Sequence, residues 1–266
     1  MRLATFLPPD SEIPRAGEVR EEGGEMRLYG YAQEDLTVLD RLIDPEAAPV
    51  ESQSWALDDV TLLAPVPAPR AIFGIGLNYS DHVAEMGGQA PERPLVFMKL
   101  PSSAAPPNAP VHCPQVVRRL DYEGELAVVM GAGRSVAGYA VADDVTARDL
   151  QGREQQWTRA KGADGFCPYG PWITTADEVP DPHALALRTW VNGELRQESN
   201  TSNLIFTVPE LIEFISETCT LAAGDLILTG TPAGVGMGRK PPAFLGPDDL
   251  VRIEIEGLGA IEHLIA

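Results

Sequence analysis

Proline and glycine recur along the whole chain and restrict what it can fold into. The 266 residues include 24 prolines and 25 glycines, both above the usual shares of roughly 5% and 7%. Proline interrupts helices and central strands because it lacks a backbone N–H donor, and glycine is typical of turns. The sequence therefore predicts many turns and short strands, and we expect a β-dominated α+β fold.

A short proline-rich stretch divides the chain. Pro65, Pro67 and Pro69 alternate with other residues, which favours extended backbone and prevents a helix from continuing. We expect a domain boundary here, with a small N-terminal domain over residues 1–65 and a larger domain over residues 66–266. The N-terminal segment contains no cluster of reactive side chains, so we interpret it as a cap or scaffold.

Apolar runs and turn residues predict the main elements of the larger domain. The expected elements are strands at 70–76, 95–99, 120–130 and 136–141, and an ordered proline-rich loop at 101–114. Asn192-Gly193 predicts a hairpin with a type I′ turn, because both residues tolerate positive φ. Thr207 and Glu210 have the spacing of a capping box, which predicts a packing helix behind them.

Net charge and cysteine content exclude several classes of protein. The net charge of −19 would repel phosphate backbones and anionic membranes, so we expect neither nucleic acid nor a membrane as partner. No stretch approaches the roughly 20 apolar residues of a membrane span. The three cysteines, Cys113, Cys167 and Cys219, are an odd number without CxxC spacing. This pattern favours a reducing compartment, and we expect the cytoplasm.

Three carboxylates alternate along the expected strand 120–130. Because successive side chains of a strand point to opposite faces, Asp121, Glu123 and Glu125 share one face. A solvated acidic face is the commoner explanation of such a pattern. However, the apolar run 126–130 is typical of a strand buried on both faces. Buried carboxylates need a cation or a shared proton, and a hard divalent ion bound by oxygen would meet that need.

A second acidic pair, Asp143 and Asp144, follows the strand expected at 136–141. If this strand forms a hairpin with the acidic strand, either residue would bring a third oxygen ligand. The alternative is an ordinary turn in which an aspartate caps a short helix. Spacing alone does not decide between these interpretations.

His82 and Glu85 lie three residues apart in a segment that we expect to be a short helix on a mobile lid. Asn78 or Ser80 would cap this helix and Gly87 would end it. On one helix face the two side chains can form a hydrogen bond. A histidine oriented by a carboxylate is a general base near neutral pH, whereas an ordinary surface pair is the alternative.

Glycine-rich segments do not indicate nucleotide binding. Neither 74–76 nor 234–241 has the spacing of a dinucleotide-binding or phosphate-binding loop. The turn that contains Gly230 and Thr231 has backbone N–H groups able to hold a carboxylate oxygen, and a plain tight turn is the alternative. Lys161 lies in a segment with little helical pattern and, taken by itself, would be a surface lysine.

Five separated blocks occur together in one order, at residues 78–85, 121–126, 138–149, 192–197 and 228–236. In this combination the sequence resembles the fumarylacetoacetate hydrolase family over nearly all of 70–266. The segment 234–244 resembles the branch labelled 2-hydroxyhepta-2,4-diene-1,7-dioate isomerase or sugar-acid dioxo hydrolase. The resemblance implies a mixed β-sandwich roll around a metal ion, and a homodimer.

The resemblance also implies roles for individual residues. It implies metal ligands at Glu123, Glu125 and Asp144, catalytic groups at His82, Glu85 and Lys161, and substrate contacts at Thr231, Gly230 and Tyr79. It selects Asp144 over Asp143, and it leaves Asp121 beside the ligand set or exposed. The implied cofactor is Mg²⁺ or Mn²⁺, with Ca²⁺ as a stand-in in crystals.

The implied activity is hydrolysis of a C–C bond in a small 2,4-dioxo (acylpyruvate-type) acid through a metal-stabilised enolate. If His82 and Glu85 only transfer protons, the outcome is isomerisation or decarboxylation of a 2-oxo or 2-hydroxydienoic diacid. Two further hypotheses are a catalytically silent metal-binding scaffold and a β-rich domain without a site. The sequence leaves this choice open, because one metal site serves several reactions in the family.

Overall fold

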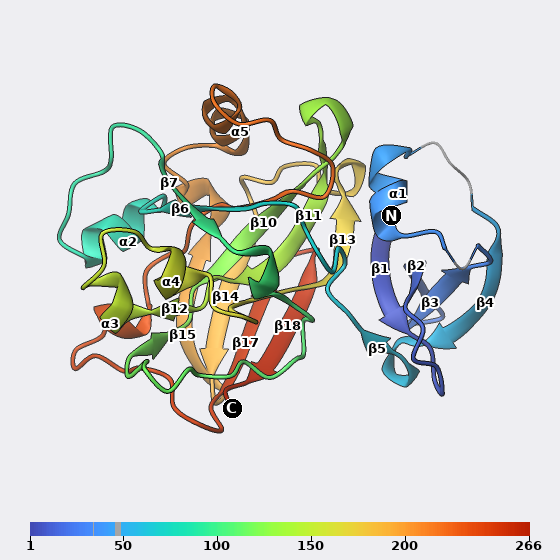
Figure 1. Ribbon diagram of the computed structural model, residues 1–266, viewed down its shortest axis with the longest axis horizontal. Coiled ribbons are helices and arrows are strands. Elements are labelled where there is room, and N and C mark those ends of the chain that lie inside the picture. Colours follow the sequence, from blue (N-terminus) through green and yellow to red (C-terminus); the bar gives the residue numbers. More distant parts are fainter. Residues whose placement is uncertain (34, 46–48) are drawn as a thin grey trace.

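Strands dominate the structure, as the proline and glycine content predicts (Figure 1). The computed structural model describes residues 1–33, 35–45 and 49–266. Its strands are β1 (Arg2–Leu7), β2 (Arg15–Glu22), β3 (Glu25–Tyr31), β4 (Glu51–Ala56), β5 (Thr61–Leu62), β6 (Ile72–Gly76), β7 (Leu95–Lys99), β8 (Ala104–Ala105), β9 (Leu120–Asp121), β10 (Gly124–Met130), β11 (Val136–Asp143), β12 (Thr146–Ala147), β13 (Cys167–Thr175), β14 (Ala186–Val191), β15 (Glu194–Asn200), β16 (Leu226–Leu228), β17 (Leu250–Ile255) and β18 (Gly259–Leu264). Its α-helices are α1 (Val38–Ile43), α2 (Ser80–Glu85), α3 (Arg148–Gln151), α4 (Thr158–Lys161) and α5 (Val208–Ser216).

One large mixed sheet runs through the molecule. Its twelve strands follow the order β4-β3-β2-β1-β13-β11-β10-β16-β6-β7, with β5 paired to β1 and β8 paired to β13. The pairs β16–β6 and β13–β8 are parallel. A four-stranded sheet, β15-β14-β17-β18, packs against β10, β11 and β13 of the large sheet. The predicted β-dominated fold with a mixed sandwich of sheets is confirmed.

The N-terminal segment continues the large sheet. Figure 1 shows β1–β5 and α1 gathered at one end of the molecule. There β1 pairs with β13 through Arg2 opposite Thr174 and Leu3 opposite Ile173. Leu3 is buried in the same apolar cluster as Ile72. The two parts of the chain thus share a sheet and a core, and separate folding of residues 1–65 stays a prediction.

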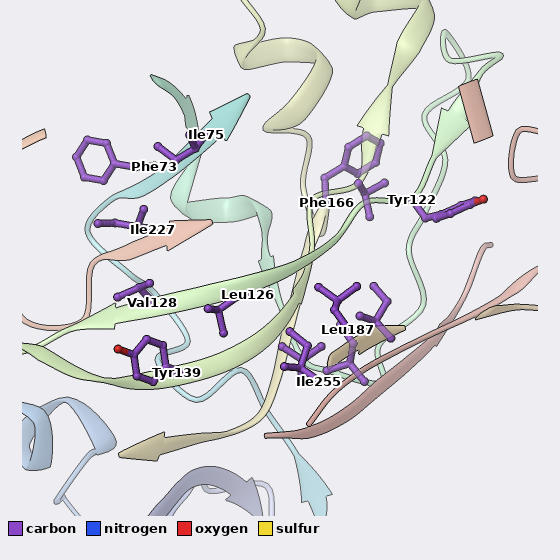
Figure 2. Packing of buried hydrophobic residues seen from close by; sticks show 14 of the residues in the cluster. Phe73, Ile75, Tyr122, Leu126, Val128, Tyr139, Phe166, Leu187, Ile227 and Ile255 are labelled. Carbon is purple, nitrogen blue, oxygen red and sulfur yellow. The ribbon is translucent and has the colours of Figure 1, made fainter. Parts of the chain in front are cut away.

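β10 is buried along its whole length, as the apolar run predicts. Leu126 lies on the side of the four-stranded sheet, in one cluster with Leu187 and Ile255 (Figure 2). Ala127 and Val129 belong to a second cluster that includes residues of α1. Because both faces of β10 pack against apolar side chains, the strand offers a rigid support for the carboxylates at its start.

The prediction of one continuous strand over 120–130 is wrong at its centre. The strand is interrupted between Asp121 and Gly124. Here side-chain oxygens, and not the carbonyl oxygens of a neighbouring strand, accept the backbone N–H hydrogen bonds. The Asp143 carboxylate accepts from the Glu123 N–H at 2.8 Å, and the Gln197 amide oxygen accepts from the Gly124 N–H at 3.0 Å. The carboxylates of the acidic stretch therefore sit at a break in the sheet.

Other predicted elements are found with small changes. The hairpin turn between β14 and β15 has positive φ at both Asn192 and Gly193. Thr207 and Glu210 form a capping box at the start of α5. The proline-rich loop 101–114 holds a single 3-10 turn and the two-residue β8. None of the helices within the described ranges has the length and apolar character to cross a lipid bilayer.

We predict that Gly74→Ala destabilises the fold. A β-carbon at Gly74 would lie 2.2 Å from the Phe97 ring, which packs over this glycine from the neighbouring strand. Moving the ring should lower the free energy of unfolding by about 1–3 kcal/mol, measured by urea denaturation. Gly88→Ala is the matched control, since the nearest atom to its β-carbon is 3.9 Å away. Equal stability of both variants would contradict the prediction.

Candidate active site

Helix α2 is held in place by Asn78 and not capped by it. The N-cap residue is Tyr79, and no side chain caps the helix, so the expected cap by Asn78 or Ser80 is wrong. The Asn78 amide instead donates to the backbone oxygens of Phe206 and Thr229, at 3.1 and 2.8 Å. These bonds fix the start of the helix to two distant segments.

His82 and Glu85 of α2 lie within hydrogen-bond distance of each other. His82 Nδ1 is 3.2 Å from Glu85 Oε2, and the His82 side chain is buried. The other Glu85 oxygen accepts a hydrogen bond of 3.0 Å from the Gly234 N–H in the glycine-rich turn. The turn therefore fixes Glu85, and Glu85 fixes the imidazole.

Glu123, Glu125 and Asp144 form one buried group whose carboxylate oxygens lie within 4.8 Å of one another. The hairpin of β10 and β11 brings them together, with Glu125 opposite Ala142 and the Asp144 N–H bonded to the Glu123 oxygen at 2.9 Å. Three buried carboxylates are a ligand set that suits a hard divalent cation. The residues present therefore fit the metal that the sequence predicts.

Three buried cations compensate these carboxylates. Lys161 Nζ lies 2.5 Å from Glu123 Oε2 and 2.6 Å from Asp144 Oδ2. Lys99 Nζ lies 2.6 Å from Asp144 Oδ1, and Arg148 Nη2 lies 2.6 Å from Glu123 Oε1. Each basic side chain is almost completely buried. The surface-lysine alternative for Lys161 is therefore excluded.

Lys161 occupies the end of α4, a one-turn helix that its sequence did not predict. Lys99 and Arg148 are functional candidates that sequence reasoning missed. The sequence does contain a signal that could have identified Lys99 as a buried functional lysine. The chain has only three lysines, and this one ends an apolar strand. Arg148 has a weaker signal, since it follows the second acidic pair closely.

The surroundings move the pKa values of two neighbouring carboxyl groups in opposite directions. Burial raises the pKa of Glu123, but the charges of Lys161 and Arg148 outweigh burial and lower it to about 2. Burial and the charges of Asp144 and Glu123 raise the pKa of Glu125 well above its usual value. Glu125 is the carboxyl group that gains most from an additional cation.

The glycine-rich turn after β16 supports the carboxylates. The Gly230 N–H donates to Glu125 Oε2 at 2.7 Å, so this donor orients a carboxylate. The Thr231 hydroxyl donates to the Gly124 oxygen at 3.0 Å and accepts from Gln197 Nε2 at 2.8 Å. Gln197 thus ties the four-stranded sheet to this turn, which sequence reasoning did not anticipate.

A cavity of about 280 Å³ opens onto the carboxylates. Of the residues predicted for the site, those on its lining are His82, Glu123, Glu125, Lys161 and Thr231. The other predicted site residues, Glu85, Asp144, Gly230 and Tyr79, are not on the lining. Tyr79 is completely buried, and its hydroxyl has no hydrogen-bond partner among the described residues. A larger hollow of about 730 Å³ next to Trp172 has no group of carboxylates and histidine on its lining.

Asp121 and Asp143 lie beside the ligand group and orient its neighbours. Asp121 is completely buried, so the exposed alternative is excluded, and it accepts from Arg148 Nε at 2.8 Å. It also accepts from the Gly236 N–H at 2.7 Å. Asp143 lies 2.9 Å from Nε2 of the buried His263 and accepts from the Glu123 backbone.

We predict that Glu123→Gln strongly weakens Mn²⁺ binding. The substitution keeps the size of the side chain but removes one ligand charge. The loss of affinity should exceed the roughly 10–100-fold that is typical of losing an outer partner of a metal ligand. Isothermal titration calorimetry measures it. Glu254→Gln is the matched control, because Glu254 pairs with Arg252 at the surface. Unchanged affinity of the Glu123 variant would remove Glu123 from the ligand set.

We also predict that Mn²⁺ affinity increases with pH. Burial and neighbouring carboxylates raise the pKa of Glu125 and keep it protonated above its usual range, and a carboxylate must lose its proton to coordinate a cation. Binding should therefore release a proton in the pH range where Glu125 is protonated. Calorimetry in two buffers with different ionisation enthalpies counts this proton. An affinity that does not change with pH would contradict the expectation.

Comparisons with known proteins identify relatives that match nearly the whole chain. A mitochondrial oxaloacetate tautomerase, FAHD2B of Bos taurus, is 46% identical over 98% of this chain and 90% of its own length. The structure of 2-hydroxyhepta-2,4-diene-1,7-dioate isomerase from Mycobacterium marinum is 36% identical with a TM-score of 0.82, covering 100% of this chain and 98% of its own.

A further solved structure is maleylpyruvate hydrolase from Sphingobium sp. SYK-6 in complex with manganese(II) ion and pyruvate. It is 31% identical with a TM-score of 0.80, and the match covers 100% of this chain and 99% of the other. Residues 71–266 match the family described as fumarylacetoacetate (FAA) hydrolase C-terminal. On this match and the identities above, the chain belongs to the fumarylacetoacetate hydrolase family of enzymes, as its sequence blocks predict.

Proposed function

We propose that the protein is a divalent-metal-dependent hydrolase that cleaves a C–C bond of a small 2,4-dioxo (acylpyruvate-type) acid. One observation carries the proposal: His82, oriented by Glu85, lines the same small cavity as the carboxylates Glu123 and Glu125. A candidate base and carboxylates that could hold a metal thus line one substrate-sized space. The Sphingobium hydrolase was solved in complex with manganese(II) and pyruvate, which supports a metal and a 2-oxo acid in this fold.

Glu123, Glu125 and Asp144 would hold Mg²⁺ or Mn²⁺. When bound, such an ion supplies electrostatic stabilisation for the negative charge that develops on the 2-oxo oxygen of the substrate. Lys161 adds a second positive charge at the same end of the cavity, because it lies beside Glu123 and Asp144. Fixed charges in a site that excludes water stabilise developing charge better than solvent does.

His82 supplies the base. In the tautomer in which Nδ1 of His82 donates to the Glu85 carboxylate 3.2 Å away, Nε2 is able to take a proton from water. The resulting hydroxide equivalent adds to the 4-carbonyl carbon of the substrate. The C3–C4 bond then breaks, its electron pair forms the enolate of the 2-oxo acid, and the proton on Nε2 returns to C3. One water is consumed, and a carboxylic acid and a 2-oxo acid are released.

Keto–enol tautomerisation of a 2-oxo acid is the second candidate. The oxaloacetate tautomerase of Bos taurus, which matches nearly the full chain, favours it. His82 would then move a proton to and from C3 without activating water. The isomerase in the name of the Mycobacterium marinum neighbour also favours a reaction that moves a proton without cleaving a C–C bond.

The homodimer and the cytoplasmic location stay predictions.

We predict that His82→Asn lowers kcat for metal-dependent hydrolysis of acetylpyruvate by about 10²–10⁴-fold, the usual contribution of a general base. Mn²⁺ binding should persist, because His82 is not in the ligand group. His112→Asn is the matched control, since His112 is exposed and away from the cavity. Product masses distinguish pyruvate and acetate from an uncleaved tautomer.

The same assay with oxaloacetate separates the candidates. Cleavage of acetylpyruvate into two acids supports the hydrolase. Loss of oxaloacetate enol absorbance without cleavage of any 2,4-dioxo acid supports the tautomerase and overturns the hydrolase. Stabilisation by Mn²⁺ without turnover of either compound would indicate the silent scaffold.

A further inference from the structure

Much of the cavity lining is apolar. Apart from the reacting groups, the lining consists mainly of an apolar wall formed by Ile75, Leu77, Met86, Phe97, Trp157 and Met237. We propose that this wall is an apolar subsite for an uncharged alkyl or aryl group. The substrate would then be a 2-oxo acid with one carboxylate and not a diacid. The inference rests on the proposed function, since it assumes that the 2-oxo acid end faces the metal ligands.

The aromatic part of the wall is built into the sheet. Phe97 lies over Gly74, where any β-carbon would collide with its ring. Its ring centroid is 5.4 Å from that of Trp157 in an edge-on arrangement. Lys161 Nζ lies 5.0 Å from the Phe97 ring centroid. Phe97 therefore contacts both a cationic and an aromatic residue of the cavity lining.

Leu77 adds an aliphatic side chain under backbone strain. It follows β6 with a φ of 56°, a left-handed conformation that is uncommon for a bulky residue. Glycine would adopt this conformation more easily, yet the chain places leucine here, on the lining of the cavity. Strained conformations of this kind concentrate at functional sites. The position of Leu77 is thus consistent with a side chain that contacts substrate.

No free cation faces the apolar wall within the described part of the chain. The lysine and the arginine on the lining, Lys161 and Arg148, already pair with buried carboxylates, and the His82 ring lies beside Glu85. Gln151, the neutral polar group of the wall, accepts from Arg148 Nη1 at 3.0 Å. A second substrate carboxylate packed against this wall would lose its hydration without gaining an unpaired counterion, which is strongly unfavourable.

Size and overall charge favour the same class of substrate. The volume of about 280 Å³ lies just below the usual range for ligand pockets, so it suits a short chain or a single ring. The net charge of −19 also repels a dianion more strongly than a monoanion at long range.

A matched pair of ligands tests the subsite without requiring turnover. The shift of Tm is measured in the presence of Mn²⁺ for 2-oxohexanoate and for 2-oxohexanedioate, which differ only in a terminal methyl or carboxylate. We expect 2-oxohexanoate to stabilise the protein at a concentration at least tenfold lower. Equal or stronger stabilisation by the diacid, or no stabilisation by either ligand, overturns the subsite.

A charge introduced at the wall should reduce the preference. Met86→Arg places a cation on the lining. We expect it to reduce by tenfold or more the ratio between the concentrations of 2-oxohexanedioate and 2-oxohexanoate that give half of the maximal Tm shift. Met98→Arg is the control with matched exposure, 38% against 40%, and Met98 is not on the lining. Met237→Arg, on a different segment, serves if the first variant disturbs α2. A ratio unchanged in both wall variants contradicts the proposal.

Turnover of 2,4-dioxoheptanoate and 2,4-dioxoheptanedioate separates this proposal from the proposed function. If neither is cleaved but 2-oxohexanoate still binds more tightly than the diacid, the hydrolase is wrong and the apolar subsite stands. If both are cleaved with similar kcat/KM and the two 2-oxo acids bind equally, the hydrolase stands and the subsite is wrong.

Discussion

The active site depends on the burial of several carboxylates in one small volume. The side chains of Glu123, Glu125 and Asp144 are almost fully removed from water. In a buried environment an unpaired charge is very unfavourable. Lys99, Lys161 and Arg148 reduce this cost by pairing with two of the three. Glu125 is left with the Gly230 N–H and no cation at contact distance among the described residues, so its raised pKa marks the place where positive charge is missing.

The surrounding fold is arranged to hold these charges in register. β10 packs between two apolar clusters and cannot shift without disturbing both. The break before β10 lets backbone N–H groups bond to Asp143 and Gln197, which connect the site to β11 and to the four-stranded sheet. Opposite, the glycine-rich turn supplies N–H donors to Glu85 and Glu125. Two sheets and one turn thus meet at the ligand group.

Local patterns predicted the elements, and contacts between distant segments completed the site. The alternation of Glu123 and Glu125 and the spacing of His82 and Glu85 are visible in the sequence because the partners are close in it. The choice of Asp144 needed the family resemblance, since Asp143 and Asp144 differ only in the direction of their side chains. Lys99, Gln197 and His263 were missed because each is far along the chain from the residue it contacts. The strand break was missed because side-chain acceptors cause it.

The pairing of β1 with β13 has a consequence for the order of folding. Arg2 and Leu3 pair with Thr174 and Ile173, so the start of β1 lacks its β13 partner on one edge until most of the chain has left the ribosome. β1 can already form antiparallel pairs with β2 and β5. During synthesis the N-terminal strands therefore present an open sheet edge, which is prone to pair with other chains. Slow translation or a truncation before β13 would expose this edge for longer and favour aggregation.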